Sequence, residues 1–335
     1  MKRCYRLTIA GILFVTAATA LSAQSKDKGK KNNPDEIGNR DVGTGINFYS
    51  LEREIALGKQ LAQEIEREAK LVDTPVPAEY VNRLAQSLAR SSDIKVPVTA
   101  KLIDSSEVNA FALPGGFLFV NAGLILKADT EAELAAAMAH EIAHVAARHG
   151  TRQASRGQVV NLASLPLIFV GGWAGYAARQ GAGLAVPLTF LKFSRGFERE
   201  ADLLGLQYIY KAGYDPTAFV DFFERLETME KRKPGTVSAL LRSHPNMATR
   251  LQYTQKNVQE LLAAQPQYVV NTSEFLDVKQ GLTLTAKARR ATPDHSGPTL
   301  RRQPGTTRAE PEGREGKADT DERPTLRRRP SDLDQ

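Results

Sequence analysis

The chain has 335 residues, 41% of them hydrophobic, and a formal net charge of +7. This supply of apolar side chains is enough for one sizeable folded domain. The basic residues do not form a stripe interleaved with aromatic residues, which argues against a nucleic-acid-binding protein. Cys4 is the only cysteine, so an intramolecular disulfide and a Cys-based metal site are excluded. Any metal site must be built from His, Asp and Glu.

The first 23 residues are predicted to be an export signal. Lys2, Arg3 and Arg6 precede a short apolar stretch, and small residues follow it up to Ala23. We expect cleavage after Ala23, with an uncleaved anchor as the alternative. Residues 24–45 are charged and rich in Gly and Asn, which predicts a flexible leader. The basic composition is compatible with peripheral contact with an anionic membrane surface.

The folded part is predicted to begin at Ser50, a good N-cap residue with Glu52 in the first turn of the helix that follows. Apolar side chains then recur at helical spacing, and a second helix is expected over 78–90. The pattern next changes to that of extended chain. Three strands are expected, at 96–103, 108–113 and 117–121, with a Pro-Gly-Gly turn at 114–116.

An Ala-rich helix is predicted after the strands. Thr130 and Glu133 form a capping box at its start, and Gly150 is a natural C-cap at its end. The later part of the chain is mostly helical in pattern. Helices are expected over 196–211, 216–232 and 247–264, with a short strand or helix over 268–278.

Two further segments have unusual compositions. Residues 160–192 are apolar and Gly-rich, and three interpretations stay open: a buried helical hairpin, a lid over the cleft, or a segment that dips into a membrane. Residues 286–335 are rich in Pro, Arg and acidic residues and are predicted to be a disordered tail. A near repeat in the tail, GPTLRRQP and RPTLRRRP, could serve partner binding, but a solvated spacer is the simpler interpretation.

Residues 140–144 read HEIAH, which is the HExxH pattern. On a helix, His140 and His144 lie about 40° apart and one turn up, so both imidazoles can reach one ion. Glu141 projects about 100° from His140, beside the ion, where it can act as a general base toward water. The alternative, two histidines on a helix face near a core, is disfavoured by the specific spacing and the capped helix.

A catalytic zinc ion needs a third protein ligand. His149 lies about 140° round the helix from His144, so we expect it to point away and to favour the helix dipole instead. Glu198 is the better candidate. It and Asp202 are spaced i, i+4 on a second predicted helix, so both carboxylates lie on one face. Asp202, one turn later on the same face, is placed to accept the outer N–H of a ligand histidine.

Two other features of the second helix follow from its geometry. Glu200 lies about 200° from Glu198 and is expected to face elsewhere. The alternative for the whole acidic face is a solvated surface that pairs with Arg195 and Arg199.

HEIAH, then FEREAD at 197–202, then a later His-Pro, resemble the M48 family of gluzincin metallopeptidases over roughly residues 45–282. The resemblance implies an α+β fold: a predominantly helical, zincin-like metalloprotease domain over 46–285, with a small antiparallel or mixed sheet beside the HExxH helix. It also implies one Zn²⁺ per chain and a defined site. The ligands would be His140, His144 and Glu198, with Glu141 as general base and Asp202 behind a ligand histidine, expected to be His140.

The resemblance extends to substrate binding and regulation. Asn109, Ala110 and Phe111 resemble a strand edge that binds extended substrate, and we expect a polypeptide to dock near 117–121. His244 resembles a histidine that closes the open zinc position in resting periplasmic members, so that its withdrawal switches activity on. By chemistry alone His244 is equally a transition-state donor or a loop residue, and Arg250 is another candidate donor to the oxyanion.

The expected function is that of a zinc-dependent endopeptidase of the periplasm. Its substrates would be misfolded or unassembled polypeptides, among them envelope or outer-membrane proteins. The alternative is a chaperone-like envelope protein that binds unfolded polypeptides while His244 latches its protease site. A structural zinc protein is a further rival and needs four permanent ligands. In the M48 member that acts in outer-membrane assembly, helical-hairpin repeats follow the protease domain. No such repeat period is found after the domain in this sequence, so the partners of that member are not expected for this chain.

Overall fold

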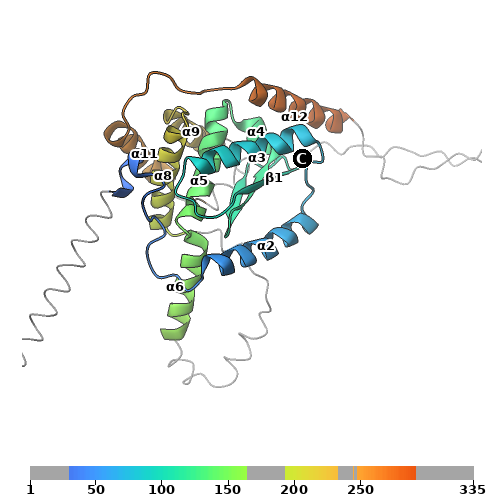
Figure 1. Ribbon diagram of the computed structural model, residues 1–335. Helices are drawn as coiled ribbons and strands as arrows, with labels where there is room; N and C mark the ends of the chain where they lie inside the picture. Colours follow the sequence, from blue (N-terminus) through green and yellow to red (C-terminus); the bar gives the residue numbers. More distant parts are fainter. Residues whose placement is uncertain (1–29, 164–192, 233–243, 245–246, 292–335) are drawn as a thin grey trace, which may run out of the picture. The chain divides into compact units, whose positions relative to one another are not determined.

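The computed structural model describes residues 30–163, 193–232, 244 and 247–291 (Figure 1). The expected signal, most of the apolar segment and most of the expected tail lie outside these residues. The chain divides into two units, Met1–Ala291 and Thr292–Gln335, and the second is wholly outside them. The elements in chain order are η1 (Pro34–Glu36), α2 (Leu51–Glu68), α3 (Pro75–Arg90), β1 (Thr99–Ile103), β2 (Ala110–Leu113), β3 (Phe117–Asn121), α4 (Ala122–Lys127), α5 (Glu131–Ala146), α6 (His149–Ala163), α8 (Arg195–Lys211), α9 (Thr217–Arg232), α11 (Met247–Leu261) and α12 (Ser273–Ala291).

The strands form one mixed sheet in the order β1-β3-β2. β3 pairs parallel with β1 and antiparallel with β2. Within the described residues β1 and β2 are the two edge strands. An isolated antiparallel bridge joins Leu71 to Ile103 at the end of β1, whose outward Leu102 carbonyl and Ala100 N–H are already bonded to the Val72 N–H and to Asn82 Oδ1. The prediction of a helical α+β fold with a small mixed sheet is confirmed.

The central position of β3 corrects one expectation. Residues 117–121 were expected to offer an edge for substrate, but β3 has strands on both sides and its backbone groups are used in pairing. An extended peptide can add only to the free side of β2.

Helices cover both faces of the sheet (Figure 1). α2 lies on one face, where Ala62 packs with the buried Phe119 and Leu113 of the strands. The other face joins the main core, in which α3 and α5 pack against the strands. Every residue of α5 is buried, and α8, α3 and α9 surround it. The Ala-rich sequence of α5 suits this position because small side chains let its neighbours approach closely.

The caps of α5 and α8 are the ones that position the site. Thr130 Oγ1 accepts a hydrogen bond from the Glu133 N–H at the start of α5, as predicted. Ser194 Oγ accepts from the Phe197 N–H at the start of α8. Glu198 therefore lies in the first turn of α8, near the positive end of the helix dipole.

The end of α5 differs from the prediction. The helix was expected to run to Gly150, but it ends at Ala146 and α6 begins at His149. Arg148 between them has φ 55°, a left-handed conformation that is uncommon outside glycine. Its side chain donates to Glu54 Oε2 at 2.7 Å and to the Tyr49 carbonyl at 2.6 Å. These tertiary contacts hold the break, which gives His149 a new direction.

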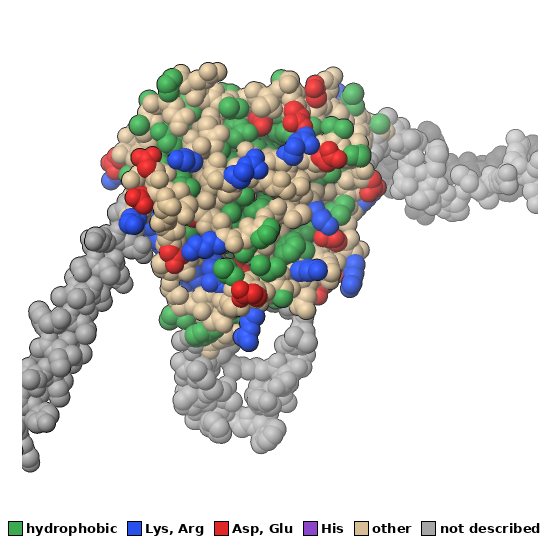
Figure 2. Space-filling model, viewed as in Figure 1, with side chains coloured by type: hydrophobic (Ala, Val, Ile, Leu, Met, Phe, Trp, Pro, Cys, Tyr) green, Lys and Arg blue, Asp and Glu red, His purple; other side chains and the backbone are tan. Residues whose placement is uncertain are grey.

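The two ends of the domain also differ from the prediction. Residues 30–45, expected to belong to a flexible leader, pack on the domain, and Val42 is in its core. α12 continues to Ala291, six residues into the expected tail. Among the described helices, none has the length and apolar character needed to cross a membrane. On the face in Figure 2 the charges of both signs are interspersed and no His side chain shows.

Candidate metal centre

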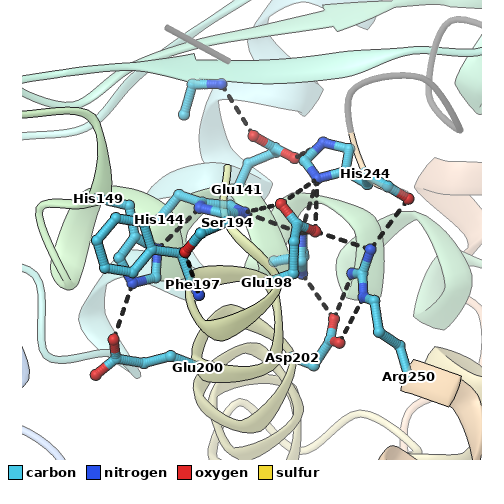
Figure 3. A network of polar contacts seen from close by, with 12 residues as sticks. Glu141, His144, His149, Ser194, Phe197, Glu198, Glu200, Asp202, His244 and Arg250 are labelled. Atoms are coloured by element: carbon cyan, nitrogen blue, oxygen red, sulfur yellow. Dashed lines mark hydrogen bonds and ion pairs between the residues drawn. The ribbon is translucent and has the colours of Figure 1, made fainter. Parts of the chain in front are cut away.

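Four buried side chains bring metal-ligand atoms together in the interior of the domain (Figure 3). His140 and His144 come from α5 and Glu198 from α8, while His244 comes from the chain between α9 and α11. One ligand atom from each lies within 4.8 Å of all the others. The three side chains expected to be ligands are thus side by side, and His244 is with them.

The spacing of the donor atoms suits a small cation. His140 Nε2 and His144 Nε2 are 3.1 Å apart, and each is 3.6 Å from a Glu198 carboxylate oxygen. His244 Nδ1 is 3.2 Å from His140 Nε2 and 3.1 Å from Glu198 Oε2. Four ligands about 2.0–2.2 Å from a tetrahedral ion are separated from one another by about 3.3–3.6 Å. The donor set and its spacing therefore fit zinc.

The charges around the donors also call for a cation. Three buried carboxylates, those of Glu141, Glu198 and Asp202, face one buried guanidinium, that of Arg250. Buried charge without a partner is costly, so two negative charges remain to be balanced. Burial lowers the pKa of His244, but the carboxylates of Glu141 and Glu198 outweigh it and raise this pKa to about 10. A protonated His244 would balance one of the two charges, whereas a divalent ion would balance both.

His144 has the protonation state that a ligand needs. Burial lowers the pKa of its imidazole well below the ordinary value. The ring is therefore neutral near pH 7 and has a lone pair available for a metal ion. Phe193 stacks on this ring with centroids 4.0 Å apart.

Asp202 and Arg250 form a rigid layer behind the donors. His140 Nδ1 faces Asp202 Oδ1 at 3.1 Å, as the sequence predicted. Arg250 donates to both oxygens of Asp202, at 2.7 and 2.6 Å, and its Nη1 is 2.8 Å from Glu198 Oε2. Burial tends to raise the pKa of Asp202, but the Arg250 guanidinium keeps it below the ordinary value. Arg250 also donates to the His244 carbonyl at 3.2 Å, so its expected role as oxyanion donor is not supported.

Glu141 lies between the donors and the sheet edge. The backbone N–H of Ala112, in β2, donates to Glu141 Oε2 at 3.1 Å. His244 Nε2 is 3.1 Å from Glu141 Oε1. The carboxylate is thus held beside the donor cluster without joining it, which is the position a general base requires.

The three residues expected to bind substrate lie at the beginning of the edge strand. Asn109 directly precedes β2, and its buried Oδ1 has no hydrogen-bond partner within the described residues. The side chain of Phe111 stacks on Phe119, on the side of the sheet away from α5. Ala110 and Ala112 face the main core. Any contact of β2 with an extended peptide must therefore come mainly from its backbone.

Sequence reasoning missed one pair of residues. His149 was expected to point away from the site, yet its Nδ1 is 2.9 Å from His144 Nδ1. Glu200 faces away from the donors, as expected, but its Oε2 lies 3.0 Å from His149 Nε2. The expected angle between His144 and His149 assumed that both lie on one straight helix, and the break at Arg148 invalidates that assumption. No local signal marks that break, because Arg is not a residue type that favours the left-handed conformation.

Comparison with known proteins gives the family. The family model described as Peptidase family M48 matches residues 75–258, more than half of the chain. The chain belongs to peptidase family M48. The matched M48 segment contains all four donors as well as Glu141, Asp202 and Arg250. The predicted family is therefore confirmed. M48 is a metallopeptidase family, so it implies a metal ion, and the buried His-His-Glu-His cluster is able to bind one.

Individual M48 relatives are bacterial and mitochondrial proteases. The chain is 30% identical over 244 residues to the beta-barrel assembly-enhancing protease of Escherichia coli K12, covering 70% of this chain and 49% of that protein. It is 34% identical over 224 residues to the putative beta-barrel assembly-enhancing protease of Vibrio cholerae, covering 64% and 46%. It is 29% identical over 201 residues to metalloprotease LoiP of E. coli K12, covering 59% and 77%. The chain spans about half the length of the first two relatives.

Proposed function

We propose that this M48 chain is a zinc-dependent endopeptidase of the cell envelope that cleaves misfolded or unassembled polypeptides. The observation that carries the proposal is the place of Glu141, between an edge strand and a buried set of donors that fits zinc. A base in that position can serve a peptide bond that lies along the strand.

Each residue has a defined task in this proposal. His140, His144 and Glu198 hold one zinc ion, and Asp202 orients His140 through its Nδ1. When bound, zinc would polarise the scissile carbonyl and make nearby water more acidic. Glu141 takes a proton from the attacking water and returns it to the leaving amine.

The substrate binds as an added strand on β2. In an antiparallel pair, alternate residues direct their backbone groups to the same neighbour. The Ala112 N–H donates to Glu141 and so points away from β3, which makes the Ala110 and Ala112 backbone the free side of the strand. An extended polypeptide can pair there whatever its side chains, which suits unfolded substrates of varied sequence. Of the three residues expected to bind substrate, Ala110 makes this contact through its backbone, while Asn109 and Phe111, whose backbone groups face β3, flank it.

The cell envelope and its proteins are proposed on two grounds. The expected export signal would take the chain to the periplasm, with peripheral membrane contact favoured by its net charge of +7. Two relatives are named for beta-barrel assembly, which suggests outer-membrane proteins as substrates here too.

A second candidate function is that of a chaperone-like protein that holds unfolded polypeptides with its protease site latched. The observation that favours it is the position of His244, whose two ring nitrogens each lie 3.1 Å from a carboxylate, one of Glu141 and one of Glu198. In that position His244 contacts both the general base, Glu141, and a proposed metal ligand, Glu198. Water activation would require it to withdraw.

The experiment that tests the endopeptidase proposal is the substitution Glu141→Gln in the full chain. We expect one zinc ion per chain and an unchanged melting temperature, with cleavage of unfolded casein reduced by about 10²–10⁴-fold because the proton acceptor is lost. Zinc is measured by metal analysis of the untagged protein, and cleavage by release of labelled peptide.

The exposed Glu64 of α2 provides the matched control, since Glu64→Gln makes the same chemical change away from the site. Equal cleavage by wild type and E141Q would refute the assigned mechanism. If E141Q still suppresses aggregation of an unfolded polypeptide as well as wild type, the binding function is separate from proteolysis.

A further inference from the structure

The two histidines of the HExxH helix have different partners behind them. His140 faces a carboxylate directly, at 3.1 Å. His144 instead has the imidazole of His149 behind it, with the two Nδ1 atoms 2.9 Å apart. Glu200 stands behind His149, with its Oε2 3.0 Å from His149 Nε2. On its Nδ1 side, away from the other donors, His144 thus reaches a carboxylate through a second ring (Figure 3).

This geometry defines where the protons are. If His144 uses Nε2 toward the other donors, its proton is on Nδ1 and must be donated to His149 Nδ1. His149 then carries its own proton on Nε2 and donates it to Glu200. Each hydrogen bond in the series has one donor and one acceptor, so both rings are held in a single tautomer.

The far end of the series is held by charge. Lys31 Nζ lies 3.0 Å from Glu200 Oε1, and Arg152 Nη1 lies 3.2 Å from Glu200 Oε2. Both cations contact the carboxylate that ends the series, so Glu200 is held in place as the acceptor of the His149 N–H.

The ring of His149 is also fixed by packing. It is fully buried and stacks on Phe197 with centroids 4.3 Å apart and planes 20° apart. Arg152 and Arg156 lie over the same Phe197 ring, at 4.7 and 4.3 Å from its centroid. A residue clamped in this way can hold its neighbour in one orientation at little entropic cost.

We propose that His149 and Glu200 are positioning residues that hold His144 in the orientation and tautomer required of a metal ligand. They do for His144 what Asp202 does for His140. This inference rests on the proposed zinc site only in that His144 is taken as a ligand. The contacts among His144, His149 and Glu200 are present without the ion.

The test compares three variants of the full chain. His149→Phe keeps a ring to stack on Phe197 but removes the acceptor, so the N–H of His144 is left buried and unpaired. His149→Asn keeps an acceptor close to the position of Nδ1. Ser155→Ala, also in α6, removes a buried hydrogen bond but contacts neither the donors nor the residues that hold Arg148, and it serves as the matched control.

Zinc affinity is measured by competition with a chromophoric chelator. We expect H149F to bind zinc about 10- to 100-fold more weakly than wild type, with H149N restoring most of the loss. S155A should bind as wild type does. Equal affinity in wild type and H149F would overturn the proposal, as would a loss in S155A as large as that in H149F.

A second measurement separates this proposal from the endopeptidase proposal. The chain has five histidines, so ¹⁵N spectra of histidine-labelled, metal-free protein can be assigned by single substitutions. We expect His144 to carry its proton on Nδ1 in wild type and H149N, and to exchange between tautomers in H149F. If wild type binds no zinc, the endopeptidase proposal fails and these tautomers decide the positioning role. If zinc binds but His144 shows the same tautomer mixture in all variants, only the positioning role fails.

Discussion

His244 illustrates how much one side chain can decide at this site. Its ring lies between two carboxylates, and its backbone carbonyl accepts from Arg250. A fourth ligand in a zinc site removes the position that a substrate carbonyl or water needs. The same imidazole, if withdrawn slightly, could instead donate to the oxyanion. The two roles have opposite consequences when the ring is removed.

The latch interpretation makes a prediction about His244→Ala. We expect basal cleavage of unfolded casein to rise by about tenfold, on the order of the contribution of one hydrogen bond to a charged group. Initial rates are measured at saturating substrate, so that a change in kcat is separated from one in KM. Asn257→Ala, which also removes a buried polar side chain but from α11, serves as control. A fall in kcat would instead identify His244 as a transition-state donor.

At the scale of elements, the site depends on how closely α5 and α8 approach. Gly205 of α8 lies against the backbone of α5 at His140. A Cβ atom at position 205 would meet the His140 nitrogen at 3.0 Å and its Cα at 3.1 Å. These are backbone atoms, which cannot move aside without shifting α5. The absence of a side chain at 205 therefore helps to set the gap between His140 and Glu198.

This packing predicts opposite results for two Gly→Ala substitutions in helices. Gly205→Ala should lower the free energy of unfolding by about 1–3 kcal/mol through overpacking, and it should weaken zinc binding. Gly281→Ala in α12 is the control, because a Cβ there meets nothing within 4 Å. It should raise stability by about 0.5–1 kcal/mol through helix propensity. Urea denaturation measures both, and a stabilised G205A would contradict the packing argument.

At the scale of the whole molecule, the N-terminal segment is part of the fold. Arg40 is buried and pairs with Asp93, with Nε 3.2 and 2.9 Å from its two oxygens. Its Nη1 donates to Gln207 of α8 at 2.8 Å and to carbonyls of the segment itself. Arg40 thus joins three parts of the chain that are far apart in sequence. Lys31, in the same segment, forms an ion pair with Glu200 of α8.

Loss of this guanidinium should destabilise the domain. Arg40→Met keeps most of the apolar stem but leaves Asp93 buried without its cation, so we expect the free energy of unfolding to fall by about 3–5 kcal/mol. Arg53→Met makes the same change at an exposed position of α2, where the free energy of unfolding should fall little. Midpoints of urea denaturation compare the two. Similar midpoints for R40M and R53M would show that the N-terminal segment adds no stability.

Several predictions from the sequence depended on local rules that hold in any context. The 3.6-residue period placed His140 and His144 on one face, and a helix spacing of four placed Glu198 and Asp202 together. The structure brings His140, His144 and Glu198 together and places Asp202 behind His140. The strand pattern located β3 at its observed bounds, but it could not show which strand was the edge, because pairing order is a long-range property.

The sequence by itself determined the family and the mixed fold class, through the resemblance that HEIAH and FEREAD carry, and it placed His140 with His144 and Glu198 with Asp202, because helical spacing acts within a single element. Only the tertiary structure decided that His149 turns toward His144, that Glu200 supports it and that Arg250 is bound to Asp202. For His149 the physical reason is the left-handed residue Arg148, whose conformation is held by Glu54 and Tyr49, about a hundred residues earlier in the chain. Contacts across such a distance in sequence leave no trace in a local pattern.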